Sequence, residues 1–153
     1  MPTAWRLIKT KHLATAWDGE GAKRKGGRWN SVGTVVVYTS ATLSLALAET
    51  LVHLPGGLLP AFTAIPVQFD EPVVTVLAPQ DVPTDWDSTP PATSTQTIGD
   101  RWVTAATSAV LRVPSVIVPQ EFNYVLNPNH ADFASLRMGT PMPFPFDARL
   151  IKP

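Results

Sequence analysis

The chain has 153 residues, with 12 basic and 12 acidic side chains, no cysteine and a formal net charge of zero. This length fits a single domain over residues 1–153. The lack of cysteine excludes disulfides, thiol catalysis and zinc–thiolate sites, and the balanced charge argues against a protein that coats nucleic acid.

The first half of the chain predicts four strands and one helix, separated by polar segments. A run of β-branched residues at Thr34–Ser40 is the strongest strand signal. The polar residues of Asp18–Gly27, rich in glycine and lysine, indicate a loop. The other predicted strands are Ala4–Ile8, Ala61–Phe69 and Val73–Leu77.

The predicted helix runs from Ala41 to about His53, with Ser40 as its cap and Pro55-Gly56-Gly57 after its end. Four leucines at near-helical spacing predict one apolar face, and Glu49 lies outside that face. The leucines are Leu43, Leu47, Leu51 and Leu54.

The second half of the chain begins with a segment poor in apolar residues, Pro79–Ile98, which indicates a long surface loop. Helices are predicted from Gly99 to about Val110 and over Ala131–Leu136. Strands are predicted at Leu111–Val118, interrupted by Pro114-Ser115, at Glu121–Leu126 and at Phe144–Ile151. Short strands mixed with few helices predict an α+β fold.

Gly26-Gly27-Arg28, beside the basic side chain of Lys25, is the first candidate site. Glycines let backbone amides approach an anion, and arginine offers a planar fork to phosphate oxygens. The segment therefore suits a pyrophosphate, although a tight turn with a solvated basic loop explains the same residues.

Tyr38 and Glu49 form the second candidate site, because a strand that feeds a helix commonly places residues from both at one cleft. A carboxylate stabilises an oxocarbenium-like sugar, and a tyrosine ring stacks on a flat cation. The alternative is a solvated Glu49 paired with His53 on the helix surface.

Two further segments carry polar residues in apolar surroundings. Ser115 lies within a predicted strand and has no nucleophile-elbow motif, so a positioning hydrogen bond is its expected role. Asn127-Pro128-Asn129-His130 is typical of a turn that caps a short helix, although His130 is also a possible acid or base. The histidines show no metal-ligand spacing, so we expect no metal.

Taken together, these motifs resemble the RES-domain toxin family, which is named for an Arg, a Glu and a Ser. The resemblance runs from Trp5 to Leu150. The matching pieces, in order, are Trp5-Arg6, Gly19-x-Gly21-Ala22, Gly26-Gly27-Arg28-Trp29-Asn30, Tyr38-Thr39-Ser40, Ala46-Leu47-Ala48-Glu49, Gly99-Asp100-x-Trp102, Val113-Pro114-Ser115, Asn123-Tyr124-x-x-Asn127-Pro128-x-His130 and Phe146-Asp147-x-Arg149-Leu150.

The resemblance implies a fold similar to the diphtheria-toxin type of ADP-ribosyltransferase, with NAD⁺ as substrate. It implies the catalytic residues Arg28, Tyr38, Glu49 and Ser115. The residues expected to bind NAD⁺ are Lys25, Gly26, Gly27, Arg28, Trp29, Tyr38, Asn127 and His130.

The resemblance also implies partners. The expected protein is the toxin of a type II toxin–antitoxin pair, and its antitoxin is an Xre-like protein whose C-terminal segment blocks the active site. A homodimer or a larger toxin–antitoxin complex is expected. No segment matches a signal peptide or a membrane span, so we expect a cytoplasmic protein that contacts neither membrane nor nucleic acid directly.

The acceptor of the ribosyl group stays open between water, phosphate and a protein. Some ADP-ribosyltransferases carry a second acidic residue two positions before the catalytic glutamate; Leu47 at that position favours a small acceptor. A module that binds a nucleotide or a partner without catalysis is the alternative of another class. A ribonuclease is disfavoured, since no pair of histidines or basic stripe supports it.

Overall fold

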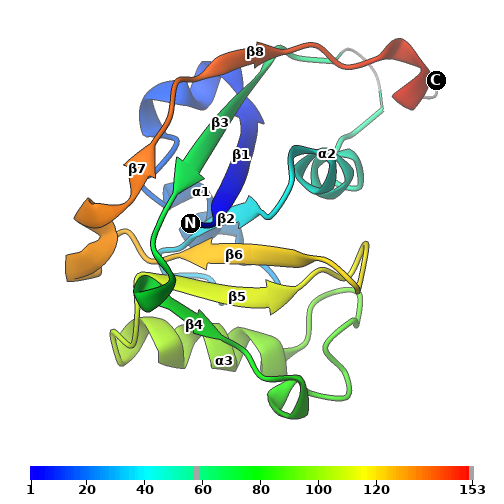
Figure 1. The fold of residues 1–153 in the computed structure, drawn as a ribbon. Helices are drawn as coiled ribbons and strands as arrows, with labels where there is room; N and C mark the ends of the chain where they lie inside the picture. The colour runs from blue at the N-terminus through cyan, green and yellow to red at the C-terminus, as the bar shows by residue number, and fades with distance from the viewer. Residues whose placement is uncertain (57–58, 152–153) are drawn as a thin grey trace.

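The computed structural model, which describes residues 1–56 and 59–151, is built around one curled sheet (Figure 1). Within these residues the strand order is β4–β5–β6–β2–β1–β3–β7, and β8 also pairs with β3. β4 and β5 are parallel, and the other pairs are antiparallel. The strands are β1 Thr3–Lys9, β2 Val37–Ser40, β3 Phe62–Gln68, β4 Val74–Val76, β5 Val110–Pro114, β6 Phe122–Leu126, β7 Arg137–Met138 and β8 Met142–Phe144.

Two of the three α-helices in the described residues pack at different places on this sheet. Figure 1 shows α3 (Thr93–Thr104) alongside β4 and β5, whereas α2 (Leu43–Leu51) contacts β1 and β2. The third, α1, covers Glu20–Lys25. Short 3₁₀ helices cover Thr10–Thr15, Glu71–Val73, Pro79–Asp81, Ala131–Ser135 and Ala148–Leu150.

Both faces of β5 and β6 are buried. Val110 of β5 joins a core cluster with Phe69 and Leu126, whereas its neighbour Leu111 joins a second cluster with Trp102. Because successive side chains of a strand point to opposite faces, this assignment follows the strand period of two. Strands that are covered on both faces need apolar side chains at every position, which explains the nearly continuous apolar runs in this part of the sequence.

The predicted helix after the strong strand is confirmed as α2, but its cap and its buried face differ from the prediction. Thr42, not Ser40, caps the helix, since its side chain accepts a hydrogen bond from the Leu45 amide at 3.0 Å. The buried residues are Leu45 and Ala46 rather than the four predicted leucines. Glu49 follows Leu45 by four residues, so it lies on the side of the helix that meets the sheet.

The ends of this helix also differ from the prediction. α2 begins at Leu43, two residues after the expected start, and ends at Leu51 instead of continuing to about His53. Pro55 and Gly56 come after that end, and Gly57 lies outside the described residues.

The loop predicted for Asp18–Gly27 is wrong, because its centre forms helix α1. This helix has no buried residues and therefore no hydrophobic periodicity. Its signals are electrostatic: the Asp18 carboxylate accepts a hydrogen bond from the Glu20 amide at 2.9 Å, and three basic residues occupy the last turn. Gly26 ends the helix with a φ of 70°, a conformation that favours glycine.

The predicted helix from Gly99 to Val110 lies too far along the chain. α3 begins at Thr93, inside the segment that was predicted to be a loop, and ends at Thr104. Its buried residues are Thr95, Gly99 and Trp102, which share one face through their helical spacing. Thr95 and Gly99 are small and not strongly apolar, so the buried face of the first turns shows no hydrophobic pattern in the sequence.

The end of the chain is less regular than predicted. The strand expected to reach Val118 stops at Pro114, and the helix expected over Ala131–Leu136 is a 3₁₀ helix. The edge strand predicted at Phe144–Ile151 is wrong: β8 ends at Phe144, and a 3₁₀ turn follows. Proline interrupts the strand pattern here, because it has no N–H for the sheet ladder.

Candidate active site

Glu49 of α2 is joined by hydrogen bonds to residues at one end of the neighbouring strands β5 and β6. Its Oε1 accepts from the Ser115 hydroxyl at 2.7 Å and from the Asn123 amide at 2.8 Å. The structure thus brings together the predicted residues Glu49 and Ser115, which are 66 positions apart in the sequence. The alternative prediction was a solvated Glu49 paired with His53; the Glu49 side chain instead contacts Ser115 and Asn123.

Ser115 is fully buried directly after β5. Its Oγ accepts hydrogen bonds from the amides of Ile117 and Val118, each at 3.1 Å. Since these two bonds use the lone pairs of the oxygen, the hydroxyl proton is donated to Glu49. Ser115 therefore acts on the carboxylate of Glu49, and its burial keeps it from touching a substrate in this conformation.

Tyr38 of β2 holds its phenol between two partners. The hydroxyl donates to Asn30 Oδ1 at 2.6 Å and accepts from the Trp29 amide at 3.0 Å. Desolvation raises the pKa of this phenol above its ordinary value, and the hydrogen bond from Trp29 opposes that shift. Tyr38 consequently stays neutral, and its hydroxyl is engaged within the protein.

The Gly26-Gly27 backbone is not arranged as the predicted anion cradle. Its two amides donate within the chain, Gly26 to the carbonyl of Ala22 at 2.8 Å and Gly27 to that of Asn30 at 2.9 Å. Gly27 is needed for a different reason, because a Cβ there would lie 2.7 Å from the Tyr38 hydroxyl. Close approach to the phenol, rather than to a phosphate, explains this glycine.

Arg28 links the segment after α1 to the loop before α3. Its Nη1 donates to the carbonyls of Trp86 and Ser88, each at 2.8 Å. A guanidinium has five N–H donors, and Nη1 carries two of them. Across residues 1–56 and 59–151, no hydrogen bond engages the other three, so they remain available to an anion.

The other residues predicted to bind substrate lie in two different places. Lys25 is exposed at the end of α1, whereas Trp29 is buried in the cluster with Trp102 and Leu111. Asn127 lies directly beyond the far end of β6, about 13 Å along the strand from Asn123, and His130 follows it in the turn.

Asn127 and His130 serve the turn in which they lie. Asn127 Oδ1 accepts from the Asn129 amide at 3.0 Å, and His130 Nδ1 accepts from the Asp132 amide at 2.9 Å. The structure does not bring these two residues to Glu49, and the capping role weighed for them accounts for their contacts.

Two residues of the cluster were missed as site residues. Asn123 contacts Glu49, and its Oδ1 accepts from the Ser40 hydroxyl at 2.7 Å. Ser40 was predicted as a helix cap and as part of a motif, and Asn123 only as part of a motif. The available signal was the strand period: Tyr38 and Ser40 share one face of β2, and Val125 and Asn123 oppose them on β6.

This arrangement places three different functional groups on one face of the sheet. It holds a carboxylate with one anchored oxygen, the ring of a neutral tyrosine, and a guanidinium with unused donors on the segment that crosses Tyr38. An anion at Arg28 and a developing positive charge at Glu49 are what such groups stabilise.

A family model described as the RES domain matches residues 3–147. The chain belongs to the RES-domain family. Two relatives agree over nearly the full length: "Toxin Res" of Yersinia enterocolitica is 39% identical, covering 95% of this chain and 97% of the relative. "Prs ADP-ribosylating toxin" of Sphingobium sp. is 35% identical, covering 97% of this chain and 96% of the relative.

A solved structure shares the fold of this RES domain. The M. tuberculosis MbcT–MbcA toxin–antitoxin complex contains a chain that matches with a TM-score of 0.73 and 17% identity, covering 94% of this chain and 84% of the other. The match confirms the α+β fold class that was predicted from the sequence.

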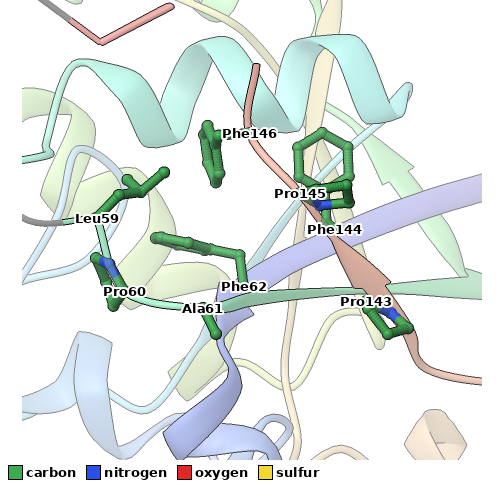
Figure 2. Close-up of a pocket in the computed structure, with 8 residues that line it drawn as sticks. All are labelled: Leu59, Pro60, Ala61, Phe62, Pro143, Phe144, Pro145 and Phe146. Carbon is green, nitrogen blue, oxygen red and sulfur yellow. The ribbon is translucent and has the colours of Figure 1, made fainter. Parts of the chain in front are cut away.

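This RES domain also has an apolar pocket of about 460 Å³, lined by residues 59–62 and 143–146. Figure 2 shows three phenylalanine side chains and three proline rings around it. It contains none of the residues of the candidate site. Among the described residues, no group of three metal-binding side chains and no helix suited to crossing a membrane is present.

Proposed function

We propose that this RES domain is the toxin of a toxin–antitoxin pair and that it cleaves NAD⁺ at the nicotinamide–ribose bond. The observation that carries the proposal is the Glu49 carboxylate, whose Oε1 receives hydrogen bonds from Ser115 and Asn123. The names of the two relatives, a Res toxin and an ADP-ribosylating toxin, support it.

In the proposed reaction the bond between the ribose carbon and the nicotinamide nitrogen breaks. Its electron pair goes to the nitrogen, which neutralises the pyridinium ring, and positive charge builds on the ribose. Glu49 stabilises that charge, so it acts mainly in the transition state. Because the leaving group becomes neutral nicotinamide, no strong general acid is required.

The substrate is proposed to lie across Tyr38, with its pyrophosphate at Arg28. The three unused N–H donors of Arg28 suit phosphate oxygens, and Lys25 adds a nearby exposed positive charge. The nicotinamide stacks against the Tyr38 ring. This assignment leaves the buried side chain of Trp29 and the turn at Asn127 and His130 with structural roles.

Water or phosphate is the proposed acceptor, giving NAD⁺ glycohydrolase or phosphorylase activity that depletes NAD⁺ in the cytoplasm and arrests growth. One observation favours a second candidate. The Sphingobium relative is named an ADP-ribosylating toxin, which supports transfer of ADP-ribose to a protein acceptor. Both reactions use the same bond cleavage and differ only in the nucleophile.

The proposed partner is an Xre-like antitoxin whose C-terminal segment occupies the site. The fold match to a toxin solved together with its antitoxin supports a partner of this kind. A homodimer or a larger toxin–antitoxin complex is proposed as the assembled state.

Product analysis tests the proposed reaction. Purified protein is incubated with NAD⁺, with and without phosphate, and nicotinamide and the sugar product are followed by mass. We expect nicotinamide release that Glu49→Ala lowers by about 10²–10³, while Glu20→Ala, which removes an exposed glutamate of α1, leaves it unchanged.

The mass of the sugar product identifies the acceptor. Addition of water or of phosphate indicates hydrolysis or phosphorolysis, and label from NAD⁺ that stays on protein in a cell extract indicates ADP-ribosylation. Absence of nicotinamide release in all three arms would contradict the proposed function and favour a module that only binds.

A further inference from the structure

We propose that Asn123, held by Ser40, is a positioning residue that determines which oxygen of Glu49 faces the substrate. The inference deepens the proposed function and rests on it for its catalytic consequence. The contact itself belongs to the folded chain and is testable without turnover.

The strand register places the pair directly opposite one another. Ser40 at the end of β2 pairs with Asn123 of β6, and Asn123 also pairs with Val113 of β5. Ser115 follows Val113 by two positions and therefore lies on the same side. Two neighbouring strands thus deliver Asn123 and Ser115 to one carboxylate from two directions.

The chemistry of the partners determines the orientation of the Asn123 amide. An ionised carboxylate only accepts hydrogen bonds, so the NH₂ group must face Glu49. The carbonyl oxygen then faces Ser40, whose hydroxyl donates to it at 2.7 Å. The donors run in one direction, from Ser40 to Asn123 and from Asn123 to Glu49.

Ser40 reinforces this orientation of the Asn123 amide. Without the Ser40 hydroxyl, the amide oxygen loses the donor that holds it, so the NH₂ group is less firmly fixed against Glu49. Ser40 is buried, so water does not readily replace the missing hydroxyl. A serine that contacts neither Glu49 nor the substrate is therefore expected to influence catalysis.

The result is a carboxylate with two unequal oxygens. Oε1 accepts from both Ser115 and Asn123, and in the described part of the chain no hydrogen bond reaches Oε2. A glutamate side chain has several rotatable bonds, and ordering it at the moment of reaction lowers the rate. Anchoring Oε1 orders the group in advance and leaves Oε2 for the ribose.

Steady-state kinetics of four variants test the catalytic consequence. Asn123→Asp keeps the shape and the acceptor for Ser40 but puts a second carboxylate oxygen against Glu49. We expect kcat to fall ~10–100-fold with KM for NAD⁺ within ~threefold. Ser40→Ala is expected to lower kcat ~3–10-fold. The controls are Asn129→Asp in the exposed turn and Ser44→Ala on the exposed side of α2.

The double variant separates positioning from general loss of stability. If Ser40 acts through Asn123, Ser40→Ala adds nothing to kcat in an Asn123→Ala background. Wild-type kcat in Asn123→Asp, or independent effects that multiply in the double variant, would overturn the inference. An inactive wild-type protein would instead contradict the proposed function.

Side-chain amide NMR reads the contact without any turnover. We expect the NH₂ signals of Asn123 to move in Glu49→Gln and in Ser40→Ala, while those of Asn129 stay in place. If the chemical shifts of the Asn123 NH₂ group are unchanged in both variants, the inference is overturned, whether or not the protein cleaves NAD⁺. Both substitutions are conservative, so we expect each variant to fold. The same spectra show whether it does.

Discussion

Tyr38 shows how one residue links the stability of the fold to the site. Its hydroxyl receives the Trp29 amide and donates to Asn30, whose amide group in turn donates to the carbonyl of Ala22. Arg6 donates to the Tyr38 carbonyl at 3.0 Å. The phenol closes the loop around Gly27 and stays neutral in the folded state, whereas in the unfolded chain it ionises at its ordinary pKa. The contribution of Tyr38 to the free energy of unfolding therefore depends on pH.

Replacing Tyr38 with phenylalanine reveals that dependence. At pH 8 we expect Tyr38→Phe to lower the free energy of unfolding by ~1–3 kcal/mol, because two buried partners lose the hydroxyl. Above pH 10, the ordinary pKa of tyrosine, the unfolded chain ionises while the folded chain resists. The free energy of unfolding of the wild type therefore falls by up to about 1.4 kcal/mol per pH unit. The difference in that free energy between the wild type and Tyr38→Phe becomes smaller.

Urea unfolding of both proteins from pH 8 to pH 11 measures that gap. Burial lowers the pKa of Arg6 to about 10, which favours the folded state as the pH rises. Both proteins share this opposite trend, so it cancels in the difference. Tyr124→Phe at the other tyrosine controls for loss of a hydroxyl, and a gap that stays constant with pH would contradict the account of Tyr38.

Helix α3 packs directly against the backbone of Trp29, and Gly99, which has no side chain, makes this close approach possible. A Cβ at Gly99 would lie 1.6 Å from the carbonyl oxygen of Trp29. Asp100 beside it accepts from the Ser31 amide at 3.0 Å, and Gln96 donates to the Gly27 carbonyl at 3.0 Å. The helix therefore supports the segment that presents Arg28.

Substituting glycine in two helices tests this packing. Gly99→Ala must push α3 away from backbone atoms, so we expect the free energy of unfolding to fall by ~2–4 kcal/mol. Gly21→Ala in α1 meets nothing within 4 Å, and alanine favours a helix, so it is expected to be neutral or stabilising by up to about 1 kcal/mol. Equal effects of the two substitutions in chemical denaturation would contradict the close packing.

The same elements show what could be predicted from the sequence. The helix that carries Glu49 was found, and so was the strand within Thr34–Ser40, although β2 begins only at Val37. The apolar residues of both are conspicuous. α1 and the first turns of α3 were missed because charge and small side chains hold them. The packing of Gly99 forms only once α3 meets the Trp29 backbone, so no local pattern reports it.

On the scale of the whole molecule, the sheet brings residues far apart in the sequence to one carboxylate. The meeting of Glu49 and Ser115 agrees with the expectation that both belong to one site, whereas Asn123 and Ser40 required the strand register. The structure places Asn127 and His130, which were predicted to bind NAD⁺, beyond the end of β6 that lies away from Glu49.

The most direct test compares NAD⁺ affinity with turnover in Glu49→Gln. Glutamine keeps an oxygen for Ser115 and Asn123 but removes the charge. The account predicts that kcat falls by about 10²–10³ while Kd for NAD⁺ stays within ~threefold. Arg28→Ala should instead weaken binding, and Arg24→Ala on exposed α1 is its control. Wild-type turnover by Glu49→Gln, or equal losses of binding and turnover, would contradict the central role of this carboxylate.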